Sequence, residues 1–312
     1  MIGPYPIPLG TVLSALGGLF TGTPQAGTEG TVLFNIRLPR IAAAAIVGAA
    51  LAGAGAAYQA LFRNPLVSPD ILGVSTGAGL GAVLGILLGL PVLAIQLFGF
   101  GMGLVTVACV MLLAASLGRE NQLLIMVLAG IVIGALASAA IALVKVMADP
   151  YDQLPAITFW LLGSLAGVKT ADLLAVLPAV AIGTIPLLAL RWRIGLLSLG
   201  DEEAKTLGIE VGRLRLLVIG AATLMTASVV AISGVIGWVG LMVPHMGRFL
   251  VGPRFDRLLP VSLLLGASFM VAVDTLARTI ALIEVPLGIL TAVVGAPVFV
   301  WLLARGKASW TE

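Results

Sequence analysis

Long runs of apolar residues with little or no charge divide the chain into predicted membrane spans. A transmembrane helix needs about 20 consecutive apolar residues. The apolar windows cover residues 41–62, 71–118, 121–144, 173–190, 216–247, 258–277 and 285–304. The second window is long enough for two helices with a break at Pro91, and the fifth divides near Ser233 and Gly234 into a full span and a short one. The pattern therefore predicts an all-α, polytopic membrane helix bundle of about nine spans.

The N-terminal segment does not fit this pattern. Its first 28 residues carry no charge, and the apolar stretch 7–20 is too short to span a bilayer. No basic segment precedes it, as one would in a signal peptide. We therefore expect an interfacial helix within an extracytoplasmic or interfacial segment 1–36, followed by a membrane domain over residues 37–312.

Composition excludes several classes of protein. The chain is 60% apolar and 10% charged, against about 25% charged residues in soluble proteins, which argues against a soluble enzyme or a nucleic-acid-binding protein. One histidine and one cysteine cannot form a metal site alone. We expect Cys109 to be a small buried residue. No Gly-x-x-x-x-Gly-Lys-Ser/Thr motif occurs, so the chain lacks that route to ATP hydrolysis, and we expect no cofactor bound to it.

Cationic residues near the span ends form two unequal sets. The larger set contains Arg63, Arg119, Arg191, Arg193, Lys205, Arg213, Arg215, Arg248, Arg254, Arg257, Arg305 and Lys307. The smaller set contains Arg37, Arg40, Lys145, Lys169 and Arg278. Lysine and arginine are enriched in cytoplasmic loops. We therefore expect the larger set and the C-terminus in the cytoplasm and residues 149–172 outside.

Glycines recur every fourth residue through one predicted span, at Gly73, Gly77, Gly81, Gly85 and Gly89. This spacing puts them on one face of a helix, where small residues let neighbouring helices approach closely in lipid. A phosphate-binding loop is the alternative, but no strand precedes these glycines. The pattern favours helix packing.

One long polar segment, residues 191–215, interrupts the spans. Asp201, Glu202 and Glu203 favour the start of a short helix, which Gly208 ends, and Gly212 predicts a second turn. The segment is interpreted either as a solvated connector or as a docking element for a cytoplasmic partner.

Short motifs then follow one another over nearly the whole chain. They are Arg37-Leu-Pro-Arg40, Gln59-Ala-Leu-Phe-Arg-Asn-Pro-Leu66, Leu72-Gly-Val-Ser75, Leu197-Ser-Leu-Gly200, Glu203-Ala204 with Gly208, Gly240-Leu-Met-Val-Pro-His-Met-Gly-Arg248, Pro286-Leu-Gly288 and Gly295-Ala-Pro-Val-Phe299. In this order they resemble the FecCD/BtuC-type permeases, the membrane subunits of ABC importers for iron siderophores, haem and vitamin B12. Those permeases have ten helices, so the resemblance implies a BtuC-like fold whose first helix is missing here.

The resemblance also implies function. It implies a permease homodimer in a bacterial or archaeal inner membrane, with the substrate pathway between the subunits, two ATPase subunits that hold ATP and Mg²⁺, and an extracytoplasmic or lipid-anchored binding protein. The coupling residues would be Glu203, Ala204, Leu207, Gly208 and Arg213. Arg37 and Arg278 would meet acidic residues of the binding protein, although Arg278 could instead pair with Asp274 one helical turn away.

Three alternatives compete with an importer of an iron chelate. The same machine could carry vitamin B12 or an oxyanion. A secondary transporter would usually show charges at mid-membrane and an internal repeat. An intramembrane enzyme would need clustered ionisable residues within the spans. His245, in the motif Val-Pro-His-Met, favours a structural or interface role over haem ligation.

Overall fold

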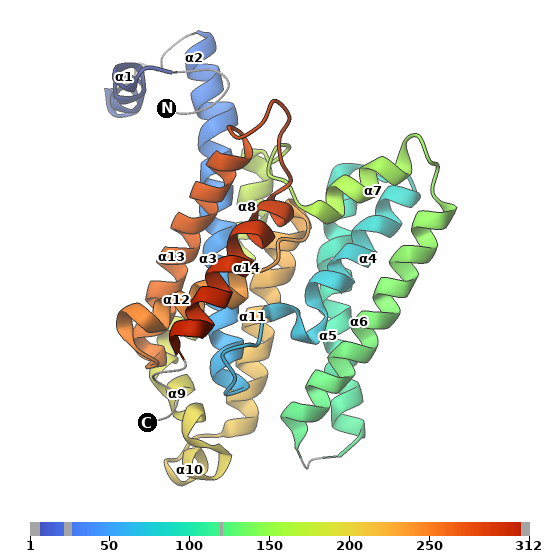
Figure 1. The fold of residues 1–312 in the computed structure, drawn as a ribbon, viewed down its shortest axis with the longest axis vertical. Coiled ribbons are helices and arrows are strands. Elements are labelled where there is room, and N and C mark those ends of the chain that lie inside the picture. Colours follow the sequence, from blue (N-terminus) through green and yellow to red (C-terminus); the bar gives the residue numbers. More distant parts are fainter. Residues whose placement is uncertain (1–6, 22–26, 119–120, 307–312) are drawn as a thin grey trace.

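The computed structural model describes residues 7–21, 27–118 and 121–306, and this part of the chain is a helix bundle without strands (Figure 1). The helices are α1 (Leu9–Thr21), α2 (Thr28–Thr31), α3 (Leu38–Leu61), α4 (Val74–Leu87), α5 (Val92–Ser116), α6 (Gln122–Met147), α7 (Gln153–Leu162), α8 (Thr170–Ala189), α9 (Arg191–Leu196), α10 (Asp201–Thr206), α11 (Val211–Ser233), α12 (Val239–Val251), α13 (Phe255–Ala277) and α14 (Leu287–Gly306). A π-helical segment η1 (Val32–Arg37) joins α2 to α3, and short 3₁₀ segments η2 (Pro69–Leu72) and η3 (Leu197–Leu199) precede α4 and α10.

Each of the nine expected spans corresponds to a helix in the described residues. Six helical runs are long and apolar enough to cross a membrane, α4 and α12 are shorter apolar helices, and the apolar run of α14 covers Leu287–Leu302. The two expected breaks are confirmed: Pro91 directly precedes α5, and α11 ends at Ser233. The sequence did not predict α7, ten residues within the segment expected outside the membrane.

The first long helical run begins earlier than its apolar window. It extends without a break over Thr28–Leu61, so the expected domain boundary between residues 36 and 37 falls inside it. Arg37 and Arg40 had delimited the window, but both side chains are buried in the structure. The run continues through them because Arg40 is neutralised by acidic residues from other elements.

Helix α3 lies at the centre of the bundle, between α11, α12 and α13 (Figure 1). Two glycine pairs allow this packing. A side chain on Gly48 would meet the backbone of Gly266 in α13, and one on Gly55 would meet the backbone of Gly240 in α12. Such contacts let backbones approach closely where lipid supplies no hydrophobic driving force.

The expected glycine ridge is shorter than the sequence suggested. Gly77, Gly81 and Gly85 of α4 face α5, where an added side chain would meet Thr106, Phe98 or Ile95. Gly73 precedes the helix with φ +75°, and its Cβ would lie beside Thr106. Gly89 lies beyond the end of α4 with φ +65° and open space around it, so it does not join the ridge.

The short apolar stretch near the N-terminus forms a helix. Helix α1 covers most of the short apolar stretch 7–20 and packs against η1 through a small cluster of Ile7, Val12, Ala15 and Leu33.

Cys109 is exposed on α5, so the expectation of a buried residue was wrong. It lies in a candidate membrane span, where an outward apolar side chain faces lipid rather than water.

Candidate functional site

The polar segment 191–215 forms a projection at one end of the bundle, which we call the α10 end (Figure 1). It contains α9, η3, the six-residue helix α10 and the start of α11. Gly200 and Gly208 flank α10 with φ +127° and +79°, a region that favours glycine. The expected second turn at Gly212 is wrong, because α11 already begins at Val211.

The predicted coupling residues divide between the inside and the outside of this projection. Ala204 is fully buried, and its carbonyl accepts a hydrogen bond from the amide of Ile209 across the turn at Gly208. Glu203, Leu207 and Gly208 are exposed, with Leu207 at 56%. An apolar side chain so exposed beside charged residues is available for a partner surface.

Three of these residues also line one hollow beside α10. Its volume is about 460 Å³, and its walls include Leu207, Gly208 and Arg213. Arg213 pairs with Glu210 at 2.7 Å, but both side chains are largely exposed, so this pair stabilises the fold little. The structure therefore brings most of the predicted coupling residues onto one surface.

A buried arginine that the sequence did not single out attaches this projection to the bundle. Arg215 donates to Asp201 at 2.8 Å and to Gln122, at the start of α6, at 2.9 Å. Arg63, just after α3, lies 3.8 Å from the same Asp201 carboxylate. Gln122 is 93 positions from Arg215, so pattern alone could not pair these two residues. The contacts connect α10 to α3, α6 and α11.

A cluster of charges lies at the opposite end of the bundle. Arg40 of α3 donates to Asp274 of α13 at 2.8 Å and holds Glu284 with two hydrogen bonds of 2.7 and 2.9 Å. Ser164, after α7, donates to Glu284 at 3.1 Å. Paired arginine and carboxylate groups with these geometries form strong charge-assisted hydrogen bonds. The cluster joins α3, α13 and the loops before α8 and α14.

Glu284 lies in the loop between α13 and α14, outside the spans. Its burial raises the pKa of its carboxyl group. The hydrogen bonds and charge of Arg40, with smaller contributions from Ser164 and Arg278, outweigh this effect and hold the pKa below its usual value. The carboxylate is therefore ionised near neutral pH.

The two predicted docking arginines lie at this same end but are not free surface cations. Arg37 is 5% exposed. Arg278 pairs with Asp274 at 3.1 Å, and its side chain is 13% exposed. The internal pair that competed with docking at Arg278 is thus present in the structure.

Removing one charge from this cluster tests its contribution to stability. We expect Asp274→Asn to lower the free energy of unfolding by about 1–3 kcal/mol, because Arg40 keeps Glu284 but loses a charged partner in a buried site. Thermal unfolding of the purified protein would measure this. Asp152→Asn, at an exposed position, is the control. Equal melting temperatures for both variants would contradict the role of the cluster.

His245 lies in an aromatic environment. It is 4% exposed, and its ring contacts Phe249 at 5.5 Å and Phe299 at 5.6 Å between centroids. In the described ranges, no group of three or more histidine, cysteine, aspartate or glutamate side chains could hold a metal ion. The packing is that of a structural residue.

Comparison with known proteins gives matches over nearly the full chain. A model of the FecCD transport family matches residues 1–305. The chain is 40% identical to the molybdate import system permease protein MolB of Haemophilus influenzae, over 98% of this chain and 91% of MolB. It is 43% identical to a protein of Helicobacter pylori strain 26695 named as an iron chelatin transport system permease, over 92% of this chain and 87% of that protein. A solved structure described as an inward-facing ABC transporter of the metal-chelate type has a TM-score of 0.86 and 39% identity, covering 95% of this chain and 97% of that one.

Proposed function

The chain belongs to the FecCD transport family, and from this premise we propose that it forms, as a homodimer, the translocation pathway of an ABC importer for an iron chelate. It is a multi-pass membrane permease subunit, not an enzyme. Such permeases work with an ATPase and with a substrate-binding protein. The proposed assembly contains two copies of this chain, two ATPase subunits that bind ATP and Mg²⁺, and one binding protein. We propose no cofactor on the chain itself.

The observation that carries the proposal is the projection formed by α10. Glu203, Leu207 and Gly208 are exposed there, while Arg215 and Asp201 attach it to the membrane helices. A projection that is exposed at its tip and anchored at its base can transmit movement between an ATPase and the bundle. A secondary transporter would have no use for such an element.

The proposed orientation puts the α10 end and the C-terminus in the cytoplasm of a bacterial or archaeal cell, at its inner membrane. Members of the larger cationic set lie at the ends of α3, α8 and α11 near α10, whereas Lys145 and Lys169 lie at the opposite ends of α6 and α8 (Figure 1). The excess of lysine and arginine on one side supports this orientation.

Single cysteines would test this orientation. In a Cys109→Ala background, we expect Lys205→Cys to react with an impermeant maleimide only from the cytoplasmic side and Asp152→Cys only from outside. Both native side chains are exposed, so access is not limited by burial. Intact cells compared with inverted vesicles provide the two sides. Labelling of both positions from the same side would contradict the orientation.

We propose that the binding protein docks near Arg37 and Arg278. Both side chains are largely buried, so a partner would have to approach them closely rather than attract them at a distance. Charge reversal at Arg278 would also disturb Asp274. A docking test therefore needs Arg278→Gln, with Asp274→Asn as the control for lost internal pairing. Weaker binding of the partner by Arg278→Gln alone supports docking.

The substrate is proposed from the relatives. An iron chelate is favoured by the H. pylori relative and by the metal-chelate transporter. An oxyanion is the second candidate, because the molybdate permease MolB matches 98% of this chain. Calorimetry of the cognate binding protein with a ferric chelate and with molybdate would distinguish them. Tight binding of molybdate alone would overturn the iron-chelate assignment.

A further inference from the structure

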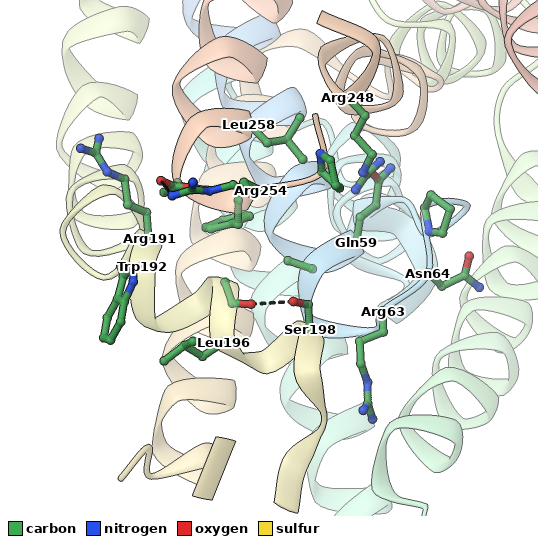
Figure 2. Close-up of a pocket in the computed structure, with 16 residues that line it drawn as sticks. Gln59, Arg63, Asn64, Arg191, Trp192, Leu196, Ser198, Arg248, Arg254 and Leu258 are labelled. Atoms are coloured by element: carbon green, nitrogen blue, oxygen red, sulfur yellow. Dashed lines mark hydrogen bonds and ion pairs between the residues drawn. The ribbon is translucent and has the colours of Figure 1, made fainter. Parts of the chain in front are cut away.

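A cavity of about 420 Å³ lies at the α10 end (Figure 2), beside the hollow lined by the predicted coupling residues, and Trp192 lines both. Four arginines and one aspartate are among its lining residues: Arg63, Arg191, Arg248, Arg254 and Asp256. The cavity therefore has a strong excess of positive charge. A cavity of this size is large enough for a small organic ligand.

The carboxylates near the cavity neutralise only part of this charge. Arg254 pairs with Asp256 at 3.0 Å, and Arg63 lies 3.8 Å from Asp201. Arg248 donates instead to the neutral side chain of Gln59 at 2.6 Å. No ion pair of Arg191 or Arg248 occurs within the described residues at salt-bridge distance. The site is suited to an anion that accepts hydrogen bonds from guanidinium groups.

The position of the cavity identifies the kind of anion. Its walls come from the ends of two candidate membrane spans, α3, which ends at Leu61, and α13, which begins at Phe255, together with α9 and Arg248 of α12. Trp192, 65% exposed, lies on its rim, and tryptophan is enriched at membrane–water interfaces. The cavity is thus at the level of lipid headgroups.

The walls combine charge with apolar surface. Leu196, Phe255 and Leu258 line the cavity beside the arginines, and Figure 2 shows Gln59 and Arg248 on one side with Arg191 and Trp192 on the other. A free phosphate ion would contact only the arginines of the wall. A phospholipid headgroup would use both parts, with its phosphate near the arginines and its glycerol region against the apolar wall.

We propose that this cavity binds the headgroup of an anionic phospholipid. The lipid would lie against α9, the helix that leads into α10, and would connect α9 to α3 and α13. The proposal concerns a lipid ligand of the chain itself and does not depend on which substrate is transported.

Native mass spectrometry of the purified chain would test it, with dioctanoyl phosphatidylglycerol and dioctanoyl phosphatidylcholine as probes. We expect at least fivefold more bound phosphatidylglycerol than phosphatidylcholine. The double variant Arg191→Gln/Arg254→Gln should lose at least fivefold of the phosphatidylglycerol. The double variant Arg193→Gln/Arg257→Gln removes the same charge from exposed positions that do not line the cavity, and it should bind as the unmodified protein does.

Three results would overturn the proposal. The first is an equal loss of phosphatidylglycerol in both double variants, which would indicate attraction by overall charge. The second is complete displacement of the lipid by inorganic phosphate at a tenfold excess, which would indicate a site for free anions. The third is loss of the lipid when the ATPase subunit is added, which would indicate that the cavity receives that subunit. A rise in melting temperature with phosphatidylglycerol, absent in Arg191→Gln/Arg254→Gln, would independently support the lipid site and would show that the variant is folded.

Discussion

A Gly208→Val variant should reach the membrane at normal levels but transport at least tenfold less substrate. Gly208 has φ +79°, and an added Cβ would meet nothing within 4 Å. The expected defect therefore comes from backbone conformation and not from crowding. A β-branched residue in this backbone conformation costs about 1–3 kcal/mol in strain. The turn that presents Leu207 would change, and the surface proposed to meet the ATPase would change with it.

Two control variants separate strain from other effects of the substitution. Gly208→Asn should retain most transport, because asparagine tolerates the left-handed conformation. Gly212→Val places the same side chain at a helical position that also has open space, and we expect it to transport normally. The measurements are substrate uptake in vesicles and copurification of the ATPase. Normal uptake by Gly208→Val would refute the role of this turn in coupling.

Replacing Gly266 with leucine should reduce the yield of folded protein more than tenfold. Gly266 of α13 and Gly48 of α3 lie so close that a Cβ on either would meet the backbone carbonyl of the other. Backbone atoms cannot rotate away as a side chain can, so the two helices would have to separate. Because α3 is the central helix, their separation would disturb most of the bundle.

The matched control is Gly220→Leu, in α11. Gly220 is also within a candidate span, but it is exposed and an added Cβ there would meet nothing within 4 Å. Its yield should equal that of the unmodified protein. Size-exclusion chromatography in detergent would compare the amounts of monodisperse protein. Similar profiles for Gly266→Leu and Gly220→Leu would show that close contact between α3 and α13 is not required.

The spans could be predicted because lipid imposes a simple requirement on sequence. A helix that crosses a bilayer has to be apolar over about 20 residues, and the resulting windows locate α5, α6, α8, α11 and α13 within a few residues. Pro91 and Gly234 marked the two breaks because proline and glycine interrupt a helix through their own backbone properties, which are visible in the sequence. Helix α7 has ten residues, so a criterion that requires about 20 apolar residues does not detect it.

The contacts between distant residues could not be predicted in this way. Glu203, Ala204 and Gly208 could be proposed as coupling residues because a motif places them within six positions of one another. Arg40 and Asp274 are 234 positions apart, and nothing local in either helix indicates the other. The same is true of Gly48 and Gly266, whose contact depends on the crossing of two helices.

The separation of Arg40 from its acidic partners has a consequence for biosynthesis. Ribosomes add about 5–20 residues per second, so roughly 10–50 s pass between the synthesis of Arg40 and that of Asp274, 234 positions later. During this interval α3 enters the membrane with an arginine that has neither Asp274 nor Glu284 to neutralise it. The nascent chain must keep that guanidinium near the polar boundary until α13 arrives. Arg40 therefore acquires its ion pairs with Asp274 and Glu284 only when synthesis of the chain is almost complete.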